Sequence, residues 1–227
     1  MRLAALFSGG KDSTVSLYRA MQDGHEITHL VTAVAANPDS YLFHTSAINM
    51  AELAAEAMGI PLVKVIIEST FDTGEAEELK EALSKLDIDG ITLGGVSSNY
   101  QGNIFTGIAS KLGLEVVAPF WEKPHEELIE YALDSGFKII FVSISADGLD
   151  QSWLGRELNR ETYEELKKIR ETHRIDIGGE GGEYCTLVLD GPIFKKSIKI
   201  EDSEISWKGM AGKLIINKAI LSEKATQ

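Results

Sequence analysis

The chain has 227 residues, enough for one large domain or for a full domain with a smaller one attached. Its 44% apolar and 25% charged residues are typical of a globular protein, and the absence of an apolar run of about 18 residues excludes a membrane-spanning helix. The net charge of −13 argues against a nucleic-acid partner, and a single cysteine, Cys185, excludes an internal disulfide and is typical of the reducing cytoplasm.

The first predicted strand runs directly into the sequence Ser-Gly-Gly-Lys-Asp-Ser, residues 8–13, and then into a helical pattern. A glycine pair between a buried strand and a helix turns backbone N–H groups toward a phosphate. Ser8 and Ser13 add hydroxyl donors, and Lys11 adds a positive charge. An ordinary turn with Asp12 or Ser13 as the helix N-cap is the alternative. The complete six-residue segment, in its place between a strand and a helix, favours a phosphate site over such a turn.

Along the first two thirds of the chain, apolar residues at helical spacing alternate with short apolar runs that are typical of buried strands. This alternation predicts an α/β fold, with a Rossmann-like parallel sheet and helices on both faces. Ligands bind at the carboxyl ends of the strands in that architecture. The predicted strands are 3–7, 27–36, 62–67, 90–95, 114–117 and 137–142, and the predicted helices are 14–21, 50–58, 79–86, 105–112 and 124–133.

The pattern changes after about residue 143, where glycines and short β-like runs replace the alternation. We therefore predict two domains, a nucleotide-binding domain at residues 1–145 and a smaller α+β domain at residues 146–227 that binds the substrate. The elements predicted in the smaller domain are a helix at 160–173 and strands at 184–189, 193–200 and 214–221.

Gly94 and Gly95 end the fourth predicted strand and so lie on the same rim of the sheet as residues 8–13. The segment 95–101 begins with these small residues and continues with hydroxyl and amide side chains that are suited to ligand contacts. A simple helix cap explains the same segment equally well.

Residues 178–183 form a second glycine-rich segment, with Glu180 and Glu183 between the glycines. Carboxylates on such a loop are suited to binding a cation or to transferring a proton. Surface glutamates in an ordinary turn are the alternative. Both interpretations stay open on composition alone.

His44 follows the second predicted strand and therefore faces the same rim. Cys185 is interpreted as a buried or half-buried strand residue and, without an adjacent base, as a poor nucleophile. The other histidines have no metal-ligand spacing, so we expect no resident metal and assign them to the surface or the core: His25, His29, His125 and His173.

Residues 8–13 resemble the PP-loop of the ATP pyrophosphatases, which split ATP between its α- and β-phosphates. Nearly the whole chain resembles one branch of that superfamily, the diphthine–ammonia ligases. The most specific part is GEGGEY at 179–184 followed by LVLDGPIFKK at 187–196. The other matching segments are SYLFHT at 40–45, GVSSNYQ at 95–101, Pro119-Phe120-Trp121, Gly148-Leu149 and Leu154-Gly155.

The resemblance implies ATP-dependent amidation of diphthine on elongation factor 2, which yields diphthamide. The carboxylate would be activated as an acyl-adenylate, and ammonia would then displace AMP. ATP and Mg²⁺ are the implied cofactors, elongation factor 2 and ammonium are the implied partners, and the cytoplasm is the implied location. An assembly of identical copies is compatible with this interpretation.

Together, the residues and the resemblance assign the site. The expected catalytic residues are Lys11, Glu180 and Glu183. The residues expected to bind ATP are Ser8, Gly9, Gly10, Lys11, Asp12, Ser13, Ala33, His44, Gly94 and Gly95. The residues expected to bind the substrate are Ser97, Tyr100, Gln101, Glu180 and Glu183.

Two places depart from the family pattern. Gly102, Asn103 and Ile104 stand where the family commonly has arginines, and Cys185 stands where it usually has an acid or a histidine. These departures bear on the substrate and on catalysis, so two alternatives stay open. The protein would then adenylate another substrate, such as a tRNA base or a small carboxylic acid, or hold ATP or AMP as a regulatory module without turnover.

Overall fold

The computed structural model describes residues 1–35, 50–67, 72–95 and 99–224, with the backbone alone at 72–75 and 99–101. The described strands are β1 (Arg2–Leu6), β2 (Glu26–Ala35), β3 (Leu62–Ile67), β4 (Gly90–Thr92), β5 (Glu115–Val117), β6 (Lys138–Ile144), β7 (Tyr184–Asp190), β8 (Lys196–Lys208) and β9 (Ala211–Glu223). The described helices are α1 (Lys11–Gln22), α2 (Ala51–Met58), α3 (Asp72–Ser84), α4 (Asn99–Leu112), α5 (His125–Asp134), α6 (Arg160–His173) and the 3₁₀-helix η2 (Gln151–Trp153).

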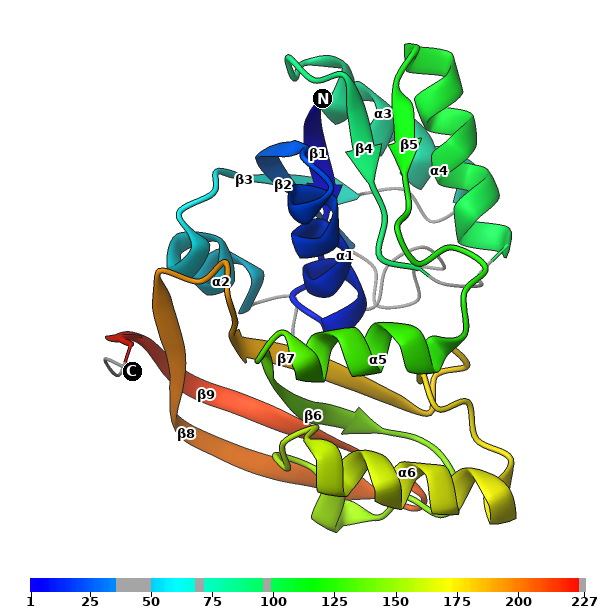
Figure 1. Ribbon diagram of the computed structural model, residues 1–227, viewed down its shortest axis with the longest axis vertical. Helices are drawn as coiled ribbons and strands as arrows, with labels where there is room; N and C mark the ends of the chain where they lie inside the picture. The colour runs from blue at the N-terminus through cyan, green and yellow to red at the C-terminus, as the bar shows by residue number, and fades with distance from the viewer. Residues whose placement is uncertain (36–49, 68–71, 96–98, 225–227) are drawn as a thin grey trace.

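These strands form two sheets (Figure 1). The first is parallel, with the strand order β3-β2-β1-β4-β5, and the second is antiparallel, with the order β7-β6-β9-β8. Each predicted helix has a counterpart, although α3 and α4 begin about two turns earlier than predicted. Their first turns are mostly polar and therefore carry no apolar periodicity that would mark them.

The side chains of β1 alternate between two apolar clusters. Leu3 and Ala5 belong to the first cluster, together with residues of α1, α2 and α5, whereas Ala4 belongs to the second, together with residues of α3 and α4. Because successive strand residues point to opposite faces, these helices cover both faces of the parallel sheet. The predicted α/β fold is confirmed.

Residues 137–142, predicted as the sixth strand of the parallel sheet, lie elsewhere. All but the first of them belong to β6, which pairs antiparallel with β7 and β9 in the second sheet. The prediction was wrong because a continuous apolar run is typical of a buried strand in either kind of sheet. Sheet membership therefore groups β6 with the C-terminal strands, and the division into domains at residue 145 stays a prediction.

The first apolar cluster joins the two sheets. It contains Val15 of α1, Ile129 of α5, Phe141 of β6 and Leu187 of β7, all of which are fully buried. Figure 1 shows α5 lying between the two sheets. The turn that follows β1 is therefore held against the second sheet. None of the helices in the described residues has both the length and the apolar character that a membrane crossing requires.

Candidate active site

The turn from β1 to α1 has the geometry of a phosphate loop. Gly9 has a φ of +80°, which glycine adopts without strain. The first amides of a helix have no intrahelical acceptor, and Gly10, the N-cap of α1, has no side chain that could accept from them. Ser13 Oγ accepts a hydrogen bond from Ser8 N at 3.2 Å, which closes the turn. The alternative in which Asp12 or Ser13 is the N-cap is wrong.

The end of β4 lies beside this turn. The strand order reverses its direction between β1 and β4, which is where α/β sheets form a ligand crevice. Gly94 follows β4 and packs against α1 so closely that a Cβ on it would lie 2.5 Å from Ser13 N. A Cβ on Gly95 would meet no described atom within 4 Å. Both glycines therefore lie on the rim that the sequence predicted.

Ala33 is buried near the end of β2, with 5% of its surface exposed. The carbonyl of Val31 accepts a hydrogen bond from Phe7 N, so the backbone of Val31 faces β1. Residues two apart in a strand have the same orientation, so the N–H and C=O of Ala33 also point to the β1 side. They lie beyond Leu6, the last residue of β1 that pairs with β2. These backbone groups lie at the rim of the sheet, and their contact with adenine stays a prediction.

Lys11 is buried at the start of α1, with 3% of its side chain exposed. Its Nζ lies 2.9 Å from both carboxylate oxygens of Asp12, 2.5 Å from the carbonyl oxygen of Gly178 and 5.3 Å from the centre of the Tyr184 ring. Burial alone lowers the pKa of Lys11, but Asp12, Tyr184 and Glu180 outweigh it and hold that pKa above its ordinary value. Lys11 is therefore a charged link between the phosphate loop and the glycine-rich acidic segment.

Strand β7 lies directly against the phosphate loop. Thr186 Oγ1 accepts a hydrogen bond from Lys11 N at 3.1 Å, and Val188 N donates to the carbonyl of Gly9 at 3.0 Å. Burial raises the pKa of Tyr184, two residues earlier on the same strand face, so its phenol stays neutral beneath Lys11. The sequence interpretation missed Thr186, for which the only signal was its spacing of two from Tyr184.

The two predicted glutamates have different surroundings. Glu180 has 15% of its side chain exposed, with Oε2 lying 3.8 Å from His125 Nε2, and its charge acts on Lys11. Glu183 turns back into its own loop, where Oε1 accepts from Asp176 N at 2.9 Å and Oε2 is buried without a partner among the described residues. The structure therefore brings Glu180 to Lys11, whereas Glu183 holds the loop together.

His125 was assigned to the surface or the core, but it lies beside this site. It begins α5, and its Nδ1 is 2.5 Å from Asp176 Oδ1. A Cβ on Gly178 would lie 2.5 Å from that same nitrogen. The carbonyl of Gly178 accepts a hydrogen bond from Lys11 Nζ, so this one glycine lies between the imidazole of His125 and the ammonium of Lys11. The sequence interpretation missed His125 and Asp176 because they are 51 residues apart and neither belongs to a recognisable motif.

The remaining predicted residues are placed in part. His44 and Ser97 lie outside the described residues, as do the side chains of Tyr100 and Gln101 on α4. Cys185 is half-buried on β7, as predicted. At the first departure from the family pattern, a Cβ on Gly102 would overlap the ring of Trp121, which leaves no room for a side chain there.

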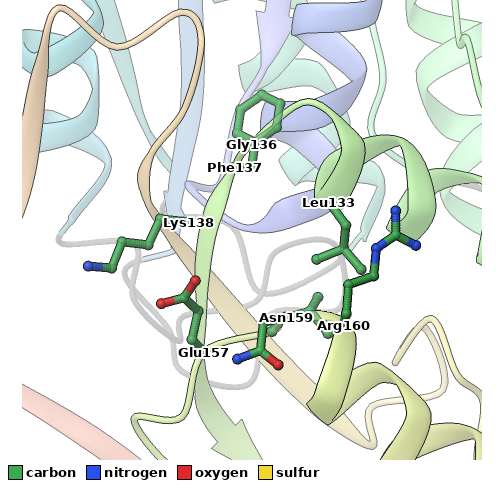
Figure 2. A pocket seen from close by; sticks show the side chains of 8 residues that line it. Leu133, Gly136, Phe137, Lys138, Glu157, Asn159 and Arg160 are labelled. Atoms are coloured by element: carbon green, nitrogen blue, oxygen red, sulfur yellow. The ribbon is translucent and has the colours of Figure 1, made fainter. Parts of the chain in front are cut away.

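A separate hollow of about 350 Å³ lies between the end of α5, the start of β6 and the start of α6 (Figure 2). Lys138, Glu157 and Arg160 are among the residues that line it. Arg160 also pairs with Asp134 of α5. No residue that lines this hollow belongs to the phosphate loop or to the acidic segment, so it is not part of the candidate site.

Two family models match the chain, the Diphthamide synthase N-terminal domain over residues 1–116 and the Diphthamide synthase C-terminal domain over residues 124–221. The chain belongs to the diphthamide synthase family. The resemblance stated from the sequence is thereby confirmed.

Individual relatives extend this result. A diphthine–ammonia ligase of Bos taurus is 34% identical over 228 aligned positions, which cover 90% of this chain and 85% of that protein. The diphthine–ammonia ligase of Homo sapiens is 33% identical with the same coverage, 90% and 85%. The one from Schizosaccharomyces pombe is 29% identical over 90% of this chain but only 37% of its own length. A tRNA-specific 2-thiouridylase of Nocardioides matches 27% of the chain, at 39% identity.

Proposed function

We propose that the protein is an ATP-dependent amide ligase that converts the carboxylate of diphthine, on elongation factor 2, to the amide of diphthamide. One observation carries the proposal: the buried Lys11 joins the phosphate loop to the acidic segment at residues 178–183. These two segments are far apart in the sequence and meet in a chain of the diphthamide synthase family. The relatives' name, diphthine–ammonia ligase, supplies the reaction.

The residues present fit ATP as a substrate. Gly10 makes no side-chain capping hydrogen bond, so the turn after β1, with Gly9 at a positive φ, offers phosphates the helix dipole and the amides beyond Lys11 N. The backbone of Ala33 serves the adenine. Mg²⁺ would be held by the ATP phosphates and by Asp12, whose carboxylate is 33% exposed, and it would neutralise phosphate charge.

The amidation has two steps. In the first, the diphthine carboxylate attacks the α-phosphorus of ATP and pyrophosphate leaves, which yields the acyl-adenylate. The amides at the start of α1, together with Lys11, stabilise the negative charge on the departing pyrophosphate. In the second, ammonia attacks the acyl carbon and AMP leaves. Glu180 attracts ammonium to the site because its carboxylate is negatively charged and lies beside His125.

The test is to incubate the protein with ATP, magnesium, ammonium and elongation factor 2 that carries diphthine, and to measure AMP and the mass of the factor. We expect AMP and the amide only when all components are present. Lys11→Met should slow adenylation by about 100-fold, the effect of one transition-state donor.

Ser16→Ala is the matched control for that variant, because Ser16 is buried in the same helix and its Oγ has no partner among the described residues. It should retain full activity. AMP formation with a tRNA or a small carboxylic acid in place of the factor, or ATP binding without turnover, would contradict the proposal. These outcomes correspond to the two alternatives.

A further inference from the structure

We infer that His125 accepts a proton from ammonium held between its Nε2 and Glu180, and so delivers neutral ammonia as the nucleophile of the second step. The inference rests on the proposed function and deepens it. It assigns a catalytic role to a histidine that no sequence motif marks.

The imidazole of His125 is fixed in orientation. Its Nδ1 lies 2.5 Å from Asp176 Oδ1, and the same oxygen accepts a hydrogen bond from Gly178 N at 2.8 Å. A carboxylate held in this way accepts the Nδ1 proton, which makes Nε2 the basic atom of the ring. Nε2 points toward Glu180 Oε2, at 3.8 Å. The geometry is that of an oriented base.

Ammonium suits the position between these two atoms. A separation of 3.8 Å exceeds a direct hydrogen bond, whereas the N–H groups of one ammonium can reach an imidazole nitrogen and a carboxylate oxygen together. The surroundings favour a cation, because among the described residues this cluster combines four carboxylates with the ammonium of Lys11. They are Asp12, Asp176, Glu180 and Glu183.

A base at this place supplies the nucleophile of the second step. Ammonium, the form present at neutral pH, has no lone pair and cannot attack an acyl carbon. His125 Nε2 removes one proton and leaves ammonia, whose lone pair forms the C–N bond. The C–O bond to AMP then breaks, AMP leaves with the electron pair, and the nitrogen releases a second proton to water. The imidazolium returns its proton to solvent.

Charged groups of three elements lie around the imidazole in the described part of the chain. Asp176 and Glu180 approach from the acidic segment, Lys11 approaches from α1 through Gly178, and Glu126 neighbours it on α5. Glu126 is itself held by Arg170 of α6, which lowers the pKa of Glu126. These groups keep a base next to an anion, which is the arrangement that a cationic substrate needs.

The experiment compares His125→Gln with the wild-type protein in three assays: ATP–pyrophosphate exchange, amide formation with ammonium, and hydroxamate formation with hydroxylamine. Hydroxylamine is mostly unprotonated at neutral pH and needs no base. We expect His125→Gln to lose about 100-fold in amide formation, the lower range of general-base effects, and to keep exchange and hydroxamate formation.

His173→Gln is the matched control. His173 also pairs with an aspartate, its Nδ1 lying 3.0 Å from Asp147 Oδ2, but it ends α6. It should behave as wild type in all three assays. If His125→Gln does not fold, Asp176→Asn provides the same test, with a smaller loss confined to ammonium.

Two results would overturn the inference. One is an equal loss in all three assays, which would make His125 a structural residue. The other is undiminished amide formation with ammonium. Failure of the proposed function is distinguishable, because the wild-type protein would then show no ATP–pyrophosphate exchange at all.

Discussion

Thr186 supplies an acceptor that the phosphate loop cannot supply for itself. The N–H of Lys11 is the first amide of α1 and has no partner within the helix. Thr186 Oγ1 accepts a hydrogen bond from this N–H, and Val188 N donates a hydrogen bond to the carbonyl of Gly9. The conformation of the loop is therefore set by a strand of the other sheet. This makes one hydroxyl important both for folding and for the nucleotide site.

Replacing Thr186 by valine should leave a buried amide without an acceptor and destabilise the protein by about 1–3 kcal/mol. ATP should bind about tenfold more weakly, the equivalent of one hydrogen bond of about 1.4 kcal/mol. Thr186→Ser keeps the hydroxyl and should restore both values. Thermal denaturation and titration calorimetry measure these quantities.

Thr92→Val is the control for this pair, because Thr92 is buried and its Oγ1 has no partner among the described residues. Losing that hydroxyl should leave stability unchanged or raise it. An unaffected Thr186→Val, or a Thr186→Ser that is equally damaged, would show that the hydroxyl does not hold the loop.

At the scale of elements, the site depends on how closely the end of β4 approaches the start of α1. The backbone of Gly94 touches the first turn of the helix at Ser13, and any Cβ would intrude there. The helices that follow β1 and β4 pack on opposite faces of the sheet at this switch point, and Gly94 meets α1 without a side chain between them. The width of the crevice is thus set by a glycine.

We expect Gly94→Ala to push β4 and α1 apart, with a destabilisation of about 1–3 kcal/mol from overpacking and a weaker affinity for ATP. Gly107→Ala on α4 is the control, since a Cβ there meets no described atom within 4 Å. It should stabilise the protein by up to about 1 kcal/mol, because alanine is the better helix former. Equal melting temperatures for the two variants would contradict this account of Gly94.

At the scale of the whole molecule, the two sheets share one apolar cluster. Leu17 of α1 is fully buried in the same cluster as Leu128 of α5 and Ile139 of β6. The N-terminal half therefore cannot bury this face of its own sheet. The phosphate loop and the acidic segment meet beside this core. Their relative position therefore depends on both halves of the chain.

Thermal unfolding should accordingly proceed in a single cooperative transition when followed by calorimetry and by circular dichroism. A fragment of residues 1–123 ends before α5 and should show no cooperative transition, because the buried face of α1 would be exposed. Two separate transitions in the full chain, or a cooperatively melting fragment, would instead show that each half has an independent core.

Sequence reasoning succeeded where the structure is local. The positive φ of Gly9 follows from the glycine pair itself, and the alternation of helices and strands follows from short-range apolar periods. The phosphate loop, the parallel sheet and the family could all be identified from these signals. The rim position of Gly94 also followed, because it needs only the order of the elements.

The rest was decided by contacts between residues far apart in the chain. An apolar run such as β6 has the same pattern in a parallel or an antiparallel sheet, so its membership depended on β7, some 40 residues later. The pairing of His125 with Asp176, and of Thr186 with Lys11, leaves no periodic trace, because each is a single long-range hydrogen bond. The sequence by itself thus determined which chemical groups the protein has and where its chain turns. Only tertiary packing decided which of those groups face one another, since that depends on how two sheets share one core.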